Sequence, residues 1–153
     1  GAHVRGLNRL HQFDKVEIVR IEKPENAIEA LDQMVEHVKG ILNELEMPYR
    51  ILRLCGGDLG FTSALTYDFE IYSTAQERWL EISSVSTFNS FQAERLQLRY
   101  KTLEGKKQSV HTLNGSALAL PRVLAAMLEN CQTEKGILLP KALIPFTGFE
   151  IIN

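Results

Sequence analysis

Cysteine is scarce in this chain, and long apolar runs are absent. Cys55 and Cys131 are the only cysteines among 153 residues, too few for a disulfide framework or a cysteine zinc site. No stretch of about 18 consecutive apolar residues occurs, so the sequence predicts no membrane-spanning helix. The first residues lack the basic and then apolar pattern of a secretion signal. These absences favour a protein of the reducing cytoplasm.

A strong excess of positive charge is also missing. The formal net charge is −2, and Lys101, Lys106 and Lys107 form the only dense basic spot. Nucleic-acid binding requires a clustered basic surface that neutralises phosphates. The sequence therefore argues against a nucleic-acid grip formed by this chain alone. It favours a solvated hairpin loop for the three lysines.

The composition is that of a folded domain. Hydrophobic residues make up 44% of the chain and charged residues 24%, which is enough for a buried core in a chain of this length. No internal repeat, linker or low-complexity segment divides the sequence. Residues 1–153 are therefore predicted to form a single domain.

Strand and helix patterns are both present. Apolar and β-branched residues partly alternate in several short segments, which predicts strands. The predicted strands cover residues 13–22, 49–54, 66–72 and 78–84, and a further strand enters residue 113. Runs of neighbouring strands with helices packed outside predict an α+β fold with a mainly antiparallel sheet flanked by helices.

Two helices carry apolar residues at the three-and-four spacing of a buried stripe. The first is predicted for residues 24–45, opened by Pro24, and the second follows residue 119. The predicted buried positions are Ile28, Leu31, Met34, Val35, Val38, Ile41 and Leu42 in the first helix, and Leu120, Val123, Leu124, Met127 and Leu128 in the second.

The stretch 112–122 combines features that packing alone does not require. Asn114 and Ser116 lie at a predicted strand end, small residues predict a turn, and Arg122 follows in the first turns of the helix. A guanidinium binds phosphate oxygens in a two-pronged geometry. This combination predicts a binding site.

Stretch 112–122 resembles motif 3 of the class II aminoacyl-tRNA synthetases, in the wording of the seryl-tRNA synthetase branch, and the motif 3 region extends over 112–130. Residues 5–17 resemble the second half of motif 2 in the same family. Further family segments follow in order at residues 48–50, 57–58, 66–70, 81–84, 91–93 and 144–148. The chain is thus identified as a member of this family, covering the C-terminal part of its catalytic domain.

The resemblance implies an activity and partners. Such enzymes use ATP and Mg²⁺ to activate L-serine as seryl-adenylate, and they transfer the serine to tRNA-Ser. The family's tRNA-gripping N-terminal arm, its dimer-forming motif 1 and the first half of motif 2 have no counterpart in this sequence. We therefore expect a homodimeric parent that holds tRNA through that arm, and little or no activation by this chain alone.

The resemblance also assigns the ATP-binding residues. They are Arg9, Phe13, Glu81, Ser84 and Arg122, with Arg9 and Arg122 as the catalytic arginines and Glu81 and Ser84 as the Mg²⁺ ligands. The residues by themselves leave alternatives open. Arg122 could be a surface residue of its helix, Phe13 a core residue, Arg9 a loop cation, and the segment around Glu81 and Ser84 a plain polar loop.

Glu17, Asn114 and Ser116 are assigned to the serine substrate by the same resemblance. Glu17 lies four residues after Phe13, so the two side chains share one face of a strand. Its carboxylate is expected to pair with the substrate ammonium. The alternatives are a solvent-facing Glu17 next to Lys15, and a Ser116 that caps the following helix.

Two rival functions follow from the same residues. One is a non-catalytic module, in which a synthetase-like domain serves only for binding. The other is structural, since a sheet that lacks neighbouring strands could expose an apolar edge that pairs with a second copy.

Overall fold

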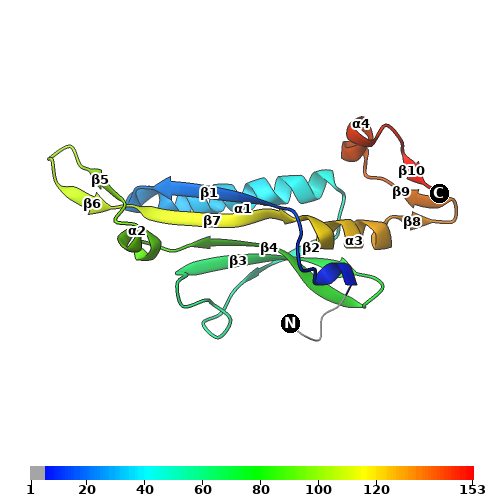
Figure 1. Ribbon diagram of the computed structural model, residues 1–153, viewed down its shortest axis with the longest axis horizontal. Coiled ribbons are helices and arrows are strands. Elements are labelled where there is room, and N and C mark those ends of the chain that lie inside the picture. The colour runs from blue at the N-terminus through cyan, green and yellow to red at the C-terminus, as the bar shows by residue number, and fades with distance from the viewer. Residues whose placement is uncertain (1–5) are drawn as a thin grey trace.

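The computed structural model describes residues 6–153, and its centre is a five-stranded antiparallel sheet (Figure 1). The strand order is β1-β7-β4-β3-β2. These strands are β1 (Lys15–Glu22), β2 (Tyr49–Arg53), β3 (Leu65–Ser73), β4 (Arg78–Thr87) and β7 (His111–Ala119). The predicted α+β class and the antiparallel sheet are confirmed.

The helices and smaller elements surround this sheet. The two long helices are α1 (Ala27–Glu44) and α3 (Leu120–Asn130), and the short helices are η1 (Gly6–Asn8), η2 (Pro24–Asn26), α2 (Phe91–Arg95), η3 (Lys141–Leu143) and α4 (Ile144–Thr147). Two small sheets complete the fold: β5 (Arg99–Lys101) with β6 (Lys107–Ser109), and β8 (Gln132–Thr133) with β9 (Gly136–Leu138) and β10 (Ile151–Ile152). Within residues 6–153, no helix has the length and apolarity needed to cross a membrane.

One face of the large sheet is covered by α1 and α3, and the core lies between them and the strands. Leu31, Val38 and Leu42 of α1 are fully buried there. Ile28 was predicted to share this stripe but is 56% exposed. The neighbouring Ala27 is buried against the sheet, and successive helix residues differ by about 100° in direction, so Ile28 points away from the sheet.

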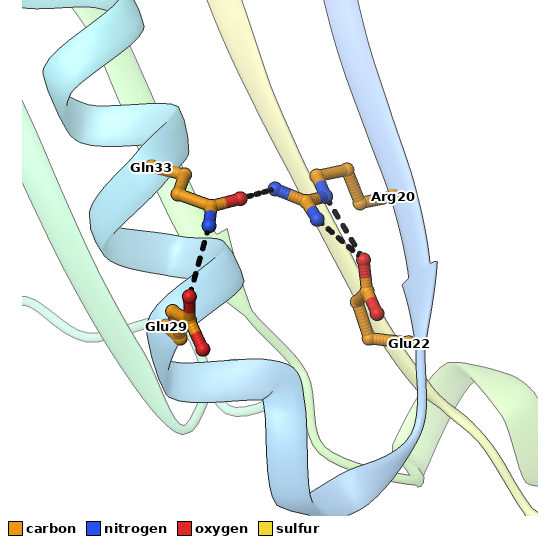
Figure 2. Close-up of polar contacts among 4 residues, drawn as sticks. All are labelled: Arg20, Glu22, Glu29 and Gln33. Atoms are coloured by element: carbon orange, nitrogen blue, oxygen red, sulfur yellow. Dashed lines mark hydrogen bonds and ion pairs between the residues drawn. The ribbon is translucent and has the colours of Figure 1, made fainter.

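Polar contacts add a second link between α1 and β1 (Figure 2). Arg20 donates from Nη1 to Oε1 of Gln33 at 2.6 Å and forms an ion pair with Glu22. Gln33 in turn donates to Glu29 one helical turn earlier, at 3.2 Å. The outermost strand is thereby tied to the helix by side chains as well as by the core.

The predicted turn in the motif 3 segment is wrong, because β7 runs through it. The strand continues through residues 114–119 instead of ending near Leu113. Gly115 lies inside it, where an added Cβ would come within 2.8 Å of Val85 Cγ2 and 3.0 Å of Val85 Cα. Gly115, one of the small residues that suggested a turn, is therefore required by close packing between β7 and β4.

α3 turns a different face to the core than predicted. Val123 and Met127 are buried as expected, but Leu120 and Leu124 are 44% and 45% exposed. Ala125 and Ala126 are buried instead. Small side chains on that face let the helix approach β3 and β4 closely, so the alanines face the sheet and the two leucines face outward.

The opposite face of the sheet carries most of the polar residues of interest. Asp68 of β3 stands opposite Ser84 of β4, and Glu17 of β1 stands opposite Ser116 of β7. Side chains alternate between the two faces of a strand. Since Phe69 and Gly115 point to the core, their neighbours Asp68 and Ser116 point to the other face.

Candidate functional site

A cavity of about 390 Å³ opens where the N-terminal end of the described chain meets β4 and the start of α3. Its walls come from η1 and the loop after it, from β4, and from the junction of β7 and α3. The lining residues are Leu7, Asn8, Arg9, Leu10, Phe13, Lys15, Glu81, Ile82, Ser83, Ser116, Ala119, Pro121 and Arg122. Five of the predicted site residues are among them: Arg9, Phe13, Glu81, Ser116 and Arg122.

Arg122 is held at the cavity wall by backbone carbonyls. It lies in the first turn of α3, directly after Pro121, whose fixed φ suits a helix start. Its Nε donates to the Asn8 carbonyl at 3.4 Å, and its Nη1 donates to the Glu81 carbonyl. A guanidinium has five N–H donors, so these two bonds fix its direction and leave donors for a ligand. These contacts favour a site role for Arg122 over the surface-residue alternative.

Phe13 faces the cavity and stands outside the core. It lies before β1, which begins at Lys15, so the prediction that Phe13 and Glu17 share one face of a strand is wrong. Its side chain is 51% exposed. The core alternative is therefore wrong, and an uncovered aromatic ring remains available for stacking. Arg9 lines the same cavity and follows the η1 turn, where its N–H donates to the Gly6 carbonyl at 3.1 Å. Arg5 lies outside the described residues.

Glu81 and Asp68 form an acidic pair on neighbouring strands. Burial raises the pKa of the Glu81 carboxyl, and Asp68 raises it further, while Arg122 lowers it. Burial likewise raises the pKa of Asp68, opposed by a hydrogen bond from Ser84. The Oδ1 atom of Asp68 is buried without a hydrogen-bond partner among the described residues. A buried carboxylate oxygen without a hydrogen-bond partner lowers the stability of the fold, and a bound cation would supply the missing partner.

Ser84 lies in the middle of β4 and not in a loop. Its neighbours Ser83 and Ser86 are 1% and 7% exposed, so the polar-loop alternative is wrong. Ser83 donates its hydroxyl to the Ser116 carbonyl, and Ser86 shares a hydrogen bond of 2.7 Å with Thr66. The serines of this strand are thus fixed by the sheet. Ser84 does not line the cavity but faces Asp68 beside it.

Glu17 contacts both Lys15 and Ser116. The Lys15 Nζ lies 2.7 Å from Glu17 Oε2, and the Ser116 hydroxyl donates to the same oxygen at 3.3 Å. The carboxylate side chain is 34% exposed. The structure thus pairs Glu17 with its neighbour Lys15, and an incoming ammonium group would compete with Lys15 for this carboxylate.

Ser116 does not cap α3, because the helix begins at Leu120 and Ala119 is the cap residue. Its bond to Glu17 joins β7 to β1 instead. Asn114 lies two residues earlier on the same face, between Val19 of β1 and Ser86 of β4. It does not line the cavity. The structure therefore brings Glu17 and Ser116 together and leaves Asn114 further along the face.

Asp68, Lys15 and Asn8 were not among the predicted site residues. Asp68 carries a sequence signal, since it is a carboxylate alternating with Thr66 and Glu70 on one face of a strand. The sequence alone could not place Asp68 in the site, because only the pairing of β3 with β4 brings Asp68 opposite Ser84. Asn8 contributes a backbone carbonyl, for which the residue type gives no signal.

The sequence of this chain matches a known protein family. A family model described as tRNA synthetase class II core domain (G, H, P, S and T) matches residues 2–131. This is most of the chain, and the chain therefore belongs to the class II tRNA synthetase core domain family.

Within that family its similarity is to serine–tRNA ligases. It is 58% identical to the serine–tRNA ligase of Salinibacter ruber and 54% identical to that of Chromobacterium violaceum. Each alignment covers all of this chain but 36% of the relative. The chain thus spans about a third of the length of these curated relatives.

Solved structures agree with this likeness. The seryl-tRNA synthetase from Pyrococcus horikoshii complexed with ATP has a TM-score of 0.93 and 37% identity, covering 100% of this chain and 35% of that one. The cytoplasmic serine–tRNA ligase from Naegleria fowleri in complex with AMP has a TM-score of 0.88 and 28% identity, covering 97% and 36%. Both neighbours were solved with an adenine nucleotide.

Proposed function

We propose that this chain is the part of a serine–tRNA ligase that binds ATP and L-serine for adenylate formation. The observation that carries the proposal is that Arg122 shares one cavity with Arg9, Phe13 and Glu81, although they are far apart in the sequence. The serine–tRNA ligase relatives at 58% and 54% identity support the same substrate. The domain boundaries 1–153, with motif regions at 5–17 and 112–130, belong to this proposal.

The cavity chemistry suits a nucleotide. Phe13 supplies an apolar surface for adenine, while Arg9 and Arg122 supply positive charge for the phosphates. In the reaction, a serine carboxylate oxygen forms a bond to the α-phosphorus, and the bond to the bridging oxygen breaks and releases pyrophosphate. Such reactions depend on positioning and charge stabilisation. The attacking carboxylate is already ionised, so no general base is required from the chain.

Glu81, Ser84 and Asp68 would hold Mg²⁺ at the phosphates. Magnesium prefers oxygen ligands and usually takes one or two protein carboxylates together with substrate phosphates and water. The pair of carboxylates with raised pKa values and the unpartnered Oδ1 of Asp68 fit this requirement. Within residues 6–153 no group of three or more His, Cys, Asp and Glu side chains is arranged to hold a metal ion, so the substrate phosphates would have to supply further ligands. Mg²⁺ would neutralise phosphate charge there.

Glu17 and Ser116 would hold the serine substrate, with Asn114 further along the same face. The Glu17 carboxylate is placed to accept the substrate ammonium in exchange for Lys15. A pocket whose own polar groups need partners discriminates well against substrates that lack them. Transfer to tRNA-Ser and assembly into a homodimer are proposed for the whole protein, of which this chain spans about a third by comparison with its relatives.

Calorimetric titration tests the proposal directly. The purified chain would be titrated with ATP·Mg²⁺ and with a non-hydrolysable seryl-adenylate analogue. We expect binding of both, and at least tenfold weaker binding by Arg122→Ala, because the guanidinium is the cation that the backbone carbonyls fix at the cavity wall.

Arg78→Ala is the matched control, since Arg78 is an exposed arginine at the start of β4 and does not line the cavity. It should bind as the unaltered chain does. A well-folded chain that binds neither ligand, or an Arg122→Ala variant that binds both normally, would contradict the proposal and favour a non-catalytic module.

A further inference from the structure

The β5–β6 hairpin projects from one end of the large sheet, away from the cavity (Figure 1). Its two three-residue strands pair with each other and form a separate two-stranded sheet. Leu103 at its tip is fully exposed. A two-stranded hairpin is marginally stable in water without support, so a hairpin that stands out in this way is poorly explained by packing alone.

Positive charge is concentrated on this hairpin. Residues 99–109 contain four cations and a single carboxylate, Glu104, which lies 3.3 Å from Lys106. Because the whole chain has a net charge of −2, the rest of it carries a net charge of −5. Arg99, Lys101 and Lys107 have no ion-pair partner within residues 6–153. The charge is thus segregated into a basic protrusion on an acidic body.

The unpaired cations surround a hollow. It is lined by Gln97, Arg99, Tyr100, Lys101 and Lys107, and its volume is about 490 Å³. Tyr100 donates its hydroxyl to Gln108 on the facing strand at 2.8 Å, which fixes the ring. Lys101 and Lys107 are directly opposite each other in the register of the hairpin. Like charges held opposite each other are destabilising, unless an anion lies between them.

A fifth cation contacts the hairpin from outside it. Lys23, in the turn between β1 and η2, places its Nζ 5.7 Å from the centre of the Tyr100 ring. This cation–π contact joins the hairpin to the sheet and brings the charge of Lys23 beside the basic set. The cations are therefore presented in a fixed arrangement and not only as a loose run along the sequence.

We infer that this basic hairpin (Lys23, Arg99, Tyr100, Lys101 and Lys107) binds the phosphate backbone of RNA. Clustered cations beside an aromatic ring on a projecting element are the electrostatic footprint of a nucleic-acid surface. Of the three lysines that the sequence shows here, only Lys106 pairs with a carboxylate, and the lining of the hollow adds Arg99 and Tyr100. The structure by itself points to RNA as the ligand of the hairpin. That this RNA is a tRNA rests on the proposed function, because a serine–tRNA ligase must bind tRNA.

Fluorescence anisotropy of a labelled tRNA transcript, titrated with the 153-residue chain at 50–200 mM KCl, tests the inference. The hairpin variant carries Arg99→Ala, Lys101→Ala and Lys107→Ala. Each phosphate contact contributes about 0.7 to 0.9 to the slope of log affinity against log salt concentration. We expect the slope to fall by about 2 to 3 in this variant, and the affinity at 50 mM KCl to fall at least tenfold.

The control variant carries Arg78→Ala, Lys135→Ala and Lys141→Ala, which removes the same charge at exposed sites outside the hairpin. It should keep the salt slope and stay within twofold in affinity. An unaltered chain that does not bind the transcript, or equal losses in both variants, would overturn the inference. So would binding to vesicles with anionic headgroups in the absence of RNA binding.

Two further measurements separate this inference from the proposed function. Binding of the seryl-adenylate analogue and the unfolding temperature are measured for the same three proteins. Failure of adenylate binding with intact RNA binding would count against the proposed function alone. Loss of RNA binding in the hairpin variant at an unchanged unfolding temperature supports the RNA surface, because a misfolded protein would not give that result.

Discussion

Asp68 and Glu81 are carboxylates held where ionisation costs free energy. Burial is the first cause of the raised pKa of each, Asp68 also raises the pKa of Glu81, and Glu70 raises the pKa of both. A carboxyl whose pKa is raised by folding binds more protons in the folded state than in the unfolded state. Its ionisation therefore lowers stability as the pH rises above the ordinary carboxyl pKa of about 4.

Asp68→Asn should stabilise the chain at neutral pH, because an amide in place of the carboxyl is not ionised there. The gain should shrink as the pH falls through the raised pKa and vanish below the ordinary carboxyl pKa of about 4. Urea unfolding measured from pH 3 to pH 8 gives the comparison. Asp32→Asn, at an exposed position of α1, is the control and should show no such gain.

The same substitution separates stability from binding. If Asp68 helps to hold Mg²⁺, Asp68→Asn should raise the Mg²⁺ concentration needed for ATP binding while the folded state becomes more stable at pH 7. A variant that is both less stable at pH 7 and unchanged in its Mg²⁺ requirement would remove Asp68 from the site.

At the scale of elements, the contact between β4 and β7 sets the geometry of the site. Gly115 lets the two strands approach, since Val85 fills the place that its side chain would take. Gly115→Ala should lower the free energy of unfolding by about 1 to 3 kcal/mol, the usual cost of overpacking a core. Urea denaturation followed by circular dichroism measures this change.

Gly40→Ala is the matched control, because it makes the same substitution in α1 where nothing lies within 4 Å of the added Cβ. It should stabilise the helix by up to about 1 kcal/mol. If the two substitutions had effects of the same sign, the close approach at Gly115 would not limit the packing of β7.

The elements also show what the sequence can and cannot predict. Strand alternation in β1 and β3 and the stripe of α1 are local patterns, so their positions were predicted within a few residues. The continuation of β7 was missed because Gly115 favours a turn locally, while the contact with Val85 is made across the sheet. The resemblance supplied Arg122, whereas Asp68 needed the register of β3 on β4.

At the scale of the whole molecule, one edge strand of the large sheet exposes apolar side chains to solvent. β1 is the outermost strand of the described sheet, and Val19 and Ile21 are 66% and 57% exposed on the face opposite α1. Exposed apolar edge strands tend to pair with other chains. We expect this chain to self-associate with rising concentration, as measured by sedimentation velocity.

Ile21→Lys should reduce that association, because a charge on an edge strand opposes pairing. Ile28→Lys is the control, since Ile28 is exposed to almost the same extent, 56%, but lies on α1. A chain that stays monomeric at all concentrations, or equal effects of the two lysines, would argue that the β1 edge does not self-associate.

The pairing of β1 with β7 has a consequence for synthesis. Glu17 and Ser116, which are bonded across these strands, are 99 residues apart. A ribosome that adds about 5 to 20 residues per second needs about 5 to 20 seconds to make the second strand after the first. Among residues 6–153, β7 is the only strand that pairs with β1, so this pairing waits for the whole of that interval. The Glu17–Ser116 contact and the cavity wall formed by Ser116 and Arg122 therefore form only after β7 and the start of α3 have been made.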